Sequence, residues 1–273
     1  VAVLYAEGEM VDDPRLGRLV ADELVERIDF VKENENVRAV VLRINSPGGD
    51  AMAAEKIRSA LLELKEKGKP VVVSMGDTAA SGGYWVSTGA EKIVADPMTL
   101  TGSIGVFAVF PKLVDLREAL SVGYGGYATE AALSDGEPWR DTSAVRRHAL
   151  KSSVDFVYRT FKSHVAEARA LPLPDVERLA AGRVWTGRQA LDLGLVDELG
   201  TLETAVTLAK KVAKLPSQSA VYHFDVRAVR WWQPILSGFP AAQTLFSKWN
   251  EAEEVFGRET GRVQAFTPLP SSL

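Results

Sequence analysis

The chain has 273 residues, of which 46% are hydrophobic and 25% are charged, and its formal net charge is -4. This composition is typical of a globular protein with one large domain, or one domain and an appendage. The mild acidity, with both signs of charge mixed, gives no reason to expect a nucleic-acid partner. The absence of cysteine excludes disulfides, thiolate metal sites and cysteine nucleophiles, and it fits a secreted or periplasmic setting without establishing one.

The chain opens on VAVLYAEGEM, whose first residues predict a core strand over 1–7. No apolar run in the sequence is long enough to span a bilayer, and the opening residues lack a signal-peptide pattern. A core strand is an unusual natural amino terminus, so we expect that the chain was cut from something longer.

Strands and helices alternate through the first 95 residues. The predicted order is strand 1–7, helix 14–33, strand 37–44, helix 51–67, strand 71–75, a helix opening in TAASGGYWVSTGA, and strand 92–95. The run VRAVVLRI is continuously apolar and β-branched, which is typical of a strand buried on both faces. Asp50 is a candidate N-cap for the helix that follows it. This βαβαβ order predicts an α/β fold with a mostly parallel sheet, flanking helices and right-handed crossovers.

The second half of the chain is predicted to be mainly helical. Helices are expected over 143–170 and 174–181, and residues 185–213 read as a helix, a short strand or turn, and another helix. From Pro216 the sequence becomes irregular and rich in aromatic residues. We therefore expect a main domain over 1–215 and a C-terminal extension over 216–273, helical or irregular, that ends in a loose tail.

Two glycine-containing loops follow two of the predicted parallel strands, SPGG (46–49) and ASGG (80–83). Both should lie at the carboxyl edge of the sheet, where ligands bind in such folds. Ser81 would open a helix, and the amide of Gly82 could point at a developing oxyanion, with Gly48 or Gly49 as the second donor. For a lone SGG, the commoner interpretation is a helix cap with tight helix–strand packing.

Four motifs occur in order along the chain: NSPGGD (45–50), MGDTAASGGYW (75–85), ADPMTLTGSIGV (95–106) and GRVWTGRQALDLGLVDELG (182–200). Together they resemble the signal peptide peptidase A family, membrane-bound serine proteases with a Clp protease/crotonase-like fold. The resemblance covers residues 1 to about 213. The YHFDV segment (222–226) and the aromatic stretch after it are similar to the C-terminal end of the long, two-domain members.

The resemblance implies a Ser/Lys dyad and no cofactor or metal. Ser81 matches the nucleophile, and Ser103 of LTGS matches the serine that hydrogen-bonds the catalytic lysine. Gly82 and a glycine of the SPGG turn, Gly48 or Gly49, match the oxyanion positions. The substrates that it implies are hydrophobic peptides such as remnant signal peptides.

The general-base lysine of the dyad is missing from its expected place. Single-domain members carry it in a segment that matches ATEAALSDGE (128–137), where Leu133 stands at or near the position. No lysine occurs between Lys112 and Lys151. In the long members the N-terminal half supplies the lysine and the C-terminal half the serine, so we expect the base to come from another domain or chain. Lys112, expected to be exposed where a helix opens after Pro111, is the in-chain substitute to consider.

Other titratable groups are weaker candidates. His148 and His164 fall on the predicted 143–170 helix, where solvated positions are expected, and His223 lies in the tail. Acidic pairs such as Asp12 and Asp13, and the later group Glu251, Glu253 and Glu254, read as solvated faces. No spacing of His, Asp and Glu suggests a metal site.

Three functions remain open from the sequence. One is a protease half-site, for which the apolar Tyr84, Trp85 and Val86 near Ser81 would suit an apolar substrate. A second is a non-catalytic assembly or binding half, and a third is a crotonase-type acyl-CoA enzyme. The expected partners are a peptide substrate, a lysine-bearing half or chain, and further subunits of a homo- or hetero-oligomer.

The resemblance also implies attachment to a membrane through a segment not present here, with the catalytic domain on the periplasmic side. Residues 227–249 combine aromatic and basic side chains, which could lie at a membrane interface. Pro234, Gly238 and Pro240 would break a long amphipathic helix there, which favours packing against a neighbouring domain or subunit instead.

Overall fold

A computed structural model describes residues 1–13, 19–123, 125 and 138–224 of the chain. A parallel β-sheet forms its centre, in the order β10-β1-β4-β5-β6-β9. These strands are β1 (Ala2–Glu7), β4 (Val40–Ser46), β5 (Val71–Ala80), β6 (Lys92–Ala95), β9 (Glu198–Leu199) and β10 (Tyr222–Phe224). Every adjacent pair along this path is parallel, which confirms the predicted α/β fold with a mostly parallel sheet.

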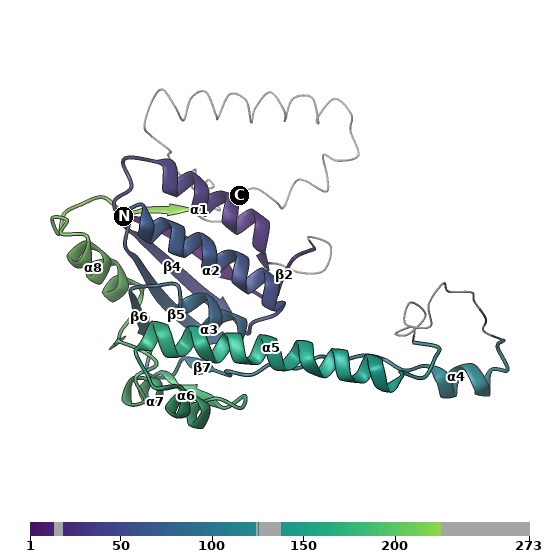
Figure 1. The fold of residues 1–273 in the computed structure, drawn as a ribbon. Coiled ribbons are helices and arrows are strands. Elements are labelled where there is room, and N and C mark those ends of the chain that lie inside the picture. The colour runs from purple at the N-terminus through teal and green to yellow at the C-terminus, as the bar shows by residue number, and fades with distance from the viewer. Residues whose placement is uncertain (14–18, 124, 126–137, 225–273) are drawn as a thin grey trace, which may run out of the picture.

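Helices cover both faces of the sheet (Figure 1). On the larger face, α1 (Ala21–Glu33), α2 (Ala51–Glu66), α3 (Gly82–Ser87) and α5 (Ala144–Arg169) contribute buried side chains to the main core. On the other face, α8 (Leu202–Val212) packs Ala205 and Ala209 against the alternate residues of the strands. Because both faces are buried, β4 and β5 read in the sequence as continuous apolar runs.

Several predicted elements are present with shifted bounds. The helix expected over 14–33 begins only at Ala21, because residues 10–11 and 19–20 form a small parallel pair, β2 (Met10–Val11) and β3 (Leu19–Val20). The helix expected over 51–67 is confirmed as α2, and the Asp50 carboxylate accepts hydrogen bonds from the amides of Met52 and Ala53 at 2.7 and 2.9 Å.

The strand expected over 71–75 is longer than predicted, since β5 continues to Ala80. An irregularity separates its two halves: Ile44 of β4 is the partner of Met75, but Ser46 is the partner of Ala79. Past this point β5 gains a new neighbour, β7 (Leu100–Gly102), whose Gly102 pairs with Ala80. The strand β7 in turn pairs antiparallel with β8 (Val184–Thr186). The short strands β7 and β8 were not predicted, because a three-residue strand gives no readable periodicity.

The remaining helices occur where the sequence predicted helices. They are α4 (Val114–Ala119), α6 (Leu173–Leu179) and α7 (Gly187–Asp192), together with α5 and α8. The long helix α5 begins beyond the sheet, on the side of α4, and its carboxyl-terminal part lies beside the sheet (Figure 1). We call residues 104–123 and 138–157 the arm. The helix α4, which belongs to the arm, buries none of its residues. The arm also exposes the apolar side chains of Phe107, Val109 and Leu120.

The predicted domain boundary near residue 215 stays a prediction. Residues 222–224 form β10 and pair with β1 in the main sheet, and the segment predicted to be aromatic-rich, 227–249, lies outside the described residues, as do Glu251, Glu253 and Glu254. None of the helices in the described ranges is both long enough and apolar enough to cross a membrane.

The N-cap of α2 generates a prediction about stability. Replacing Asp50 with Ala removes the side-chain acceptor for two otherwise unpaired amides, and we expect a loss of about 1 kcal/mol in the free energy of unfolding. Asp50→Asn keeps an acceptor oxygen and should retain most of that free energy. Urea unfolding followed by circular dichroism measures both, and equal losses in the two variants would contradict the capping role.

Candidate active site

Ser81 lies at the point where β5 ends and α3 begins. Its backbone has φ 52° and ψ -116°, a conformation that residues other than glycine rarely adopt. The Ser81 amide donates to the Gly102 carbonyl at 2.9 Å, which fixes the turn to β7. Although Ser81 occupies the N-cap position of α3, its hydroxyl makes no capping hydrogen bond. The interpretation of Ser81 as a simple helix cap is therefore wrong. Ser81 is partly exposed, and its hydroxyl does not bond to the amides of α3.

The SPGG loop lies directly against this turn. A β-carbon on Gly48 would be 2.7 Å from the Gly82 nitrogen and 2.8 Å from the Ser81 β-carbon. A β-carbon on Gly82 would in turn be 3.2 Å from the Gly48 α-carbon. Only glycine at position 48, with φ +109°, fits both the backbone conformation and the space. The two loops that the sequence placed at the sheet edge therefore touch each other.

The two glycines of the SPGG loop differ in what their amides do. The Gly48 amide donates to the buried Ser46 hydroxyl at 3.2 Å. The Gly49 amide donates to no group in the described parts of the chain, and its nitrogen is 3.4 Å from the position a Gly82 β-carbon would take. The Gly82 amide, at the first position of α3, also has no acceptor among the described residues. Gly49 and Gly82 therefore each present an unpaired amide beside Ser81.

Ser103 follows the strand next to that of Ser81. Because Ala80 pairs with Gly102, the two serines are the next residues on neighbouring strand ends. Ser103 also has a positive φ, 49°, and its amide donates to the Arg183 carbonyl at 2.7 Å. Like Ser81, Ser103 is partly exposed. The structure thus brings together Ser81, Ser103, Gly82 and the SPGG loop, while their catalytic roles stay predictions.

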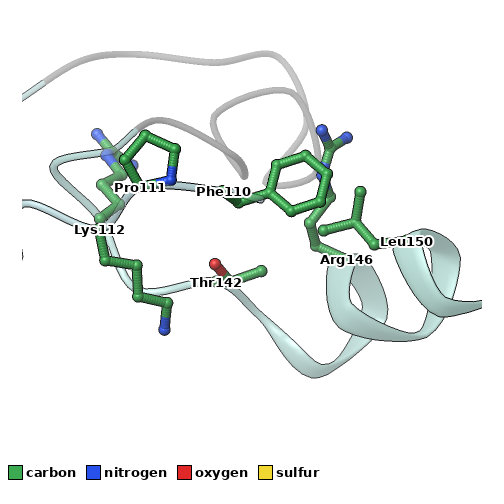
Figure 2. A pocket seen from close by; sticks show the side chains of 7 residues that line it. Phe110, Pro111, Lys112, Thr142, Arg146 and Leu150 are labelled. Atoms are coloured by element: carbon green, nitrogen blue, oxygen red, sulfur yellow. The ribbon is translucent and has the colours of Figure 1, made fainter. Parts of the chain in front are cut away.

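No lysine in the described ranges bonds to either serine. The expectation that Lys112 is exposed is confirmed: its side chain is 54% exposed, and its nearest charged partner is the Asp141 carboxylate at 3.9 Å. Lys112 lies on the arm, in a hollow whose lining residues include Phe110, Thr142, Arg146 and Leu150 (Figure 2). Leu133, the residue aligned with the expected lysine, lies outside the described residues.

The apolar residues expected to contact a substrate are instead part of the core. Tyr84 and Val86 are completely buried and Trp85 is 4% exposed. The Tyr84 hydroxyl donates to the Leu195 carbonyl at 2.8 Å, which secures the otherwise unpaired polar group. Exposed apolar side chains near the two loops come from other elements: Met52 in the first turn of α2 and Leu100 in β7 are 66% and 48% exposed.

A polar cluster behind α3 was missed by the sequence analysis. Glu55 of α2 accepts a hydrogen bond from the Trp85 indole at 2.6 Å and pairs with Arg58 at 3.0 Å. His164 of α5 lies with its Nε2 atom 3.3 Å from the Glu55 carboxylate and packs edge-on against Trp85. The expectation of a solvated His164 is therefore wrong, because α5 crosses α3 at this residue.

The other two histidines lie away from this cluster. His148 is exposed, as expected, and His223 bonds to the Tyr5 hydroxyl at 2.8 Å.

The environment of Glu55 determines its ionisation. Burial alone would raise the pKa of the Glu55 carboxyl group, but the contacts with His164 and Trp85 and the charge of Arg58 outweigh it. Together they lower this pKa from 4.5 to about 2. The carboxylate therefore stabilises the fold at all pH values above its unfolded-state pKa.

The overall fold is of the Clp protease type. The structure is similar to that of a ClpP1 point mutant from Listeria monocytogenes, with a TM-score of 0.50 over 75% of this chain and 94% of that chain, at 15% sequence identity. Residues 63–216 match the model of peptidase family S49. The chain belongs to this family, which confirms the resemblance seen in the four motifs.

Relatives match most of this chain, but this chain matches only part of them. Protease 4 from Salmonella typhi is 39% identical over 226 residues, which is 82% of this chain and 36% of that protein. The putative signal peptide peptidase SppA from Enterococcus faecium is 34% identical over 191 residues, which is 70% of this chain and 56% of that protein. The chain therefore spans between a third and three fifths of the length of these relatives.

The contact between the two loops predicts an unequal response to glycine substitutions. Gly48→Ala adds a methyl group 2.7 Å from the Gly82 nitrogen at a positive φ, and we expect a loss of about 2–4 kcal/mol in the free energy of unfolding. Gly68→Ala is the matched control, since Gly68 has φ +75° but no atom within 4 Å of the new methyl group. It should cost about 1 kcal/mol from backbone strain alone. Equal losses on chemical unfolding would show that the loops are not in contact.

The depressed pKa of Glu55 predicts a pH-dependent stability. At pH 7 we expect Glu55→Gln to lower the free energy of unfolding by about 1–3 kcal/mol, because a buried charged hydrogen-bond network loses its acceptor. The difference from the unsubstituted protein should shrink as the pH falls from 4.5 toward about 2, where the folded-state carboxylate is itself protonated. Glu66→Gln, at an exposed position of the same helix, is the control. A difference that is constant over this pH range would contradict the assignment.

Proposed function

We propose that this chain is the serine-bearing part of an endopeptidase that cleaves hydrophobic peptides such as remnant signal peptides. In this proposal Ser81 is the nucleophile, and the amides of Gly82 and Gly49 form the oxyanion hole. The observation that carries it is the strained, uncapped Ser81 beside two unpaired amides at the carboxyl edge of a parallel sheet. Membership of a peptidase family supports the same conclusion.

The chemistry follows from these positions. The Ser81 oxygen attacks the peptide carbonyl carbon while its proton passes to a neutral lysine amine. The two amides donate to the oxygen that becomes negative, and they are worth more there than in water because the site is partly desolvated. Collapse of this intermediate returns the proton to the departing amine and leaves an ester on Ser81. Water then hydrolyses the ester by the same sequence of proton transfers.

The lysine in this scheme comes from another domain or another chain. The conclusion rests on the contacts of the described lysines, none of which reaches Ser81 or Ser103, and on the share of longer relatives that this chain spans. Ser103, on the neighbouring strand end, would accept a hydrogen bond from the lysine ammonium group and hold the amine near Ser81. Assembly of several subunits, and membrane attachment with the catalytic domain on the periplasmic side, belong to the same proposal.

An apolar substrate is supported by the surface beside the site. Met52 is exposed one turn from the SPGG loop, and Leu100 is exposed two residues before Gly102. Burying such side chains against an apolar peptide contributes about 25 cal/mol per Å² of area removed from water. The name of the Enterococcus relative, signal peptide peptidase, fits a substrate of this class.

Substitution of the serines tests the proposal. In a longer protein that contains this chain and the lysine-bearing segment, Ser81→Ala should lower kcat for an apolar fluorogenic peptide by at least about 10³-fold. Ser103→Ala should lower kcat by roughly 10–10²-fold with a smaller effect on KM, because it orients the base and does not bind the peptide. Ser121→Ala is the matched control: Ser121 also has a positive φ, 51°, but lies on the arm.

The outcomes separate the alternatives. Peptide cleavage that survives Ser81→Ala would overturn the proposal and leave a crotonase-type enzyme, which needs no nucleophilic serine. If Ser81 fails to react with a fluorophosphonate even when the lysine-bearing segment is present, the chain is a non-catalytic assembly half.

A further inference from the structure

The orientation of one peptide group decides whether the Gly49 amide can reach the site. In a trans peptide the carbonyl of Gly48 and the N–H of Gly49 point in opposite directions. Gly48 and Gly49 have φ values of +109° and +143°, and glycines in this region adopt either orientation of the shared peptide with little strain. The chain near Ser81 therefore needs an external bond to hold the Gly49 N–H toward the nucleophile.

Met10 supplies that bond from the short strand β2. Its amide donates to the Gly48 carbonyl at 2.8 Å, and its carbonyl accepts from the Asp50 amide at 2.9 Å. These two bonds form a parallel bridge between Met10 and Gly49. In such a bridge the N–H and carbonyl of the central residue point to the opposite edge. The Gly49 amide is thus directed away from Met10, to the side on which Gly82 lies.

The packing around Met10 leaves this arrangement little freedom. Met10 is completely buried, and its sulfur is 3.4 Å from the position of a Gly82 β-carbon. A β-carbon on Gly49 would be only 2.1 Å from the Met10 carbonyl oxygen. Met10 also pairs with Leu19 of β3, which ties the bridge to the start of α1. The SPGG loop is therefore held between Met10 on one side and the Ser81 turn on the other.

We propose that Met10 is a positioning residue for the oxyanion hole. Its main-chain N–H fixes the Gly48–Gly49 peptide so that the Gly49 amide, and not the Gly48 carbonyl, faces the substrate oxygen. The inference rests on the proposed function of Ser81 and adds a residue distant in sequence from every motif of the site. Loss of the Met10 N–H removes the restraint on this peptide, and rotation of the peptide would place a carbonyl oxygen where a donor is needed.

The test removes the Met10 N–H without changing the side chain. An ester replaces the amide between Glu9 and Met10 when Met10 is replaced with its α-hydroxy analogue in the full-length protease. It deletes that donor, and it also weakens the Glu9 carbonyl as the acceptor of the Leu19 amide, a bond of 3.3 Å. We expect kcat for an apolar fluorogenic peptide to fall about 10²-fold, the effect of one oxyanion donor, with KM changed less than about threefold. Met10→Pro, which also lacks the N–H, should show the same split between kcat and KM.

The matched control is an ester at Ala2, whose amide donates to the Ala39 carbonyl at 3.0 Å at the far end of β1. It removes one buried backbone donor, so its stability loss should be similar, but it leaves both hydrogen bonds of Met10 in place. Thermal unfolding of both esters checks the stability, and kcat of the Ala2 ester should stay within about threefold of the unmodified protein. A Met10 ester that retains kcat, or an Ala2 ester that loses as much, would overturn the positioning role. Either result is distinct from failure of the proposed function, which Ser81→Ala reports separately.

Discussion

The site depends on the close approach of two backbone turns that carry no side chains where they meet. Gly48 and Gly82 are in contact at a spacing that leaves no room for a β-carbon on Gly48, and this contact sets Ser81 beside the SPGG loop. The approach is possible because β4 and β5 end at neighbouring points of one sheet edge. The irregularity between Ile44 and Ser46 gives β5 additional residues before it turns at Ser81. The small residues of SPGG and ASGG are therefore present in the sequence because the two turns must approach each other closely.

Much of this arrangement could be predicted from the sequence. Continuous β-branched runs identify β4 and β5, because strands buried on both faces have no polar alternation. The helix α2 is bounded by a capping Asp50 and by Gly68, both readable as single residues. The order of strand, turn and helix then places SPGG and ASGG at one edge without coordinates. The sequence left open which glycine of the SPGG loop presents a free amide, since the bond from the Gly48 amide to Ser46 depends on the folded loop.

The features that were missed all depend on contacts between distant segments. His164 reads as a solvated helix position, but the crossing of α5 over α3 places it against Glu55 and Trp85. Tyr84 to Val86 follow the Ser81 turn in sequence, yet the short helix α3 buries their side chains in the core. The strands β2 and β7 are too short to show a period, and each owes its existence to a partner elsewhere in the chain. Local pattern carries no information on such pairings.

The Glu55 cluster joins three helices that have separate parts in the site. Helix α2 follows the SPGG loop, α3 begins at the Ser81 turn, and the first part of α5 belongs to the arm. The Glu55 carboxylate accepts a hydrogen bond from Trp85 and faces His164, so it links all three helices at a single point behind the sheet edge that carries Ser81. A tilt of α5 would therefore move His164 relative to Glu55 and Trp85, so the protruding helix and the sheet edge that carries Ser81 are coupled through this one contact.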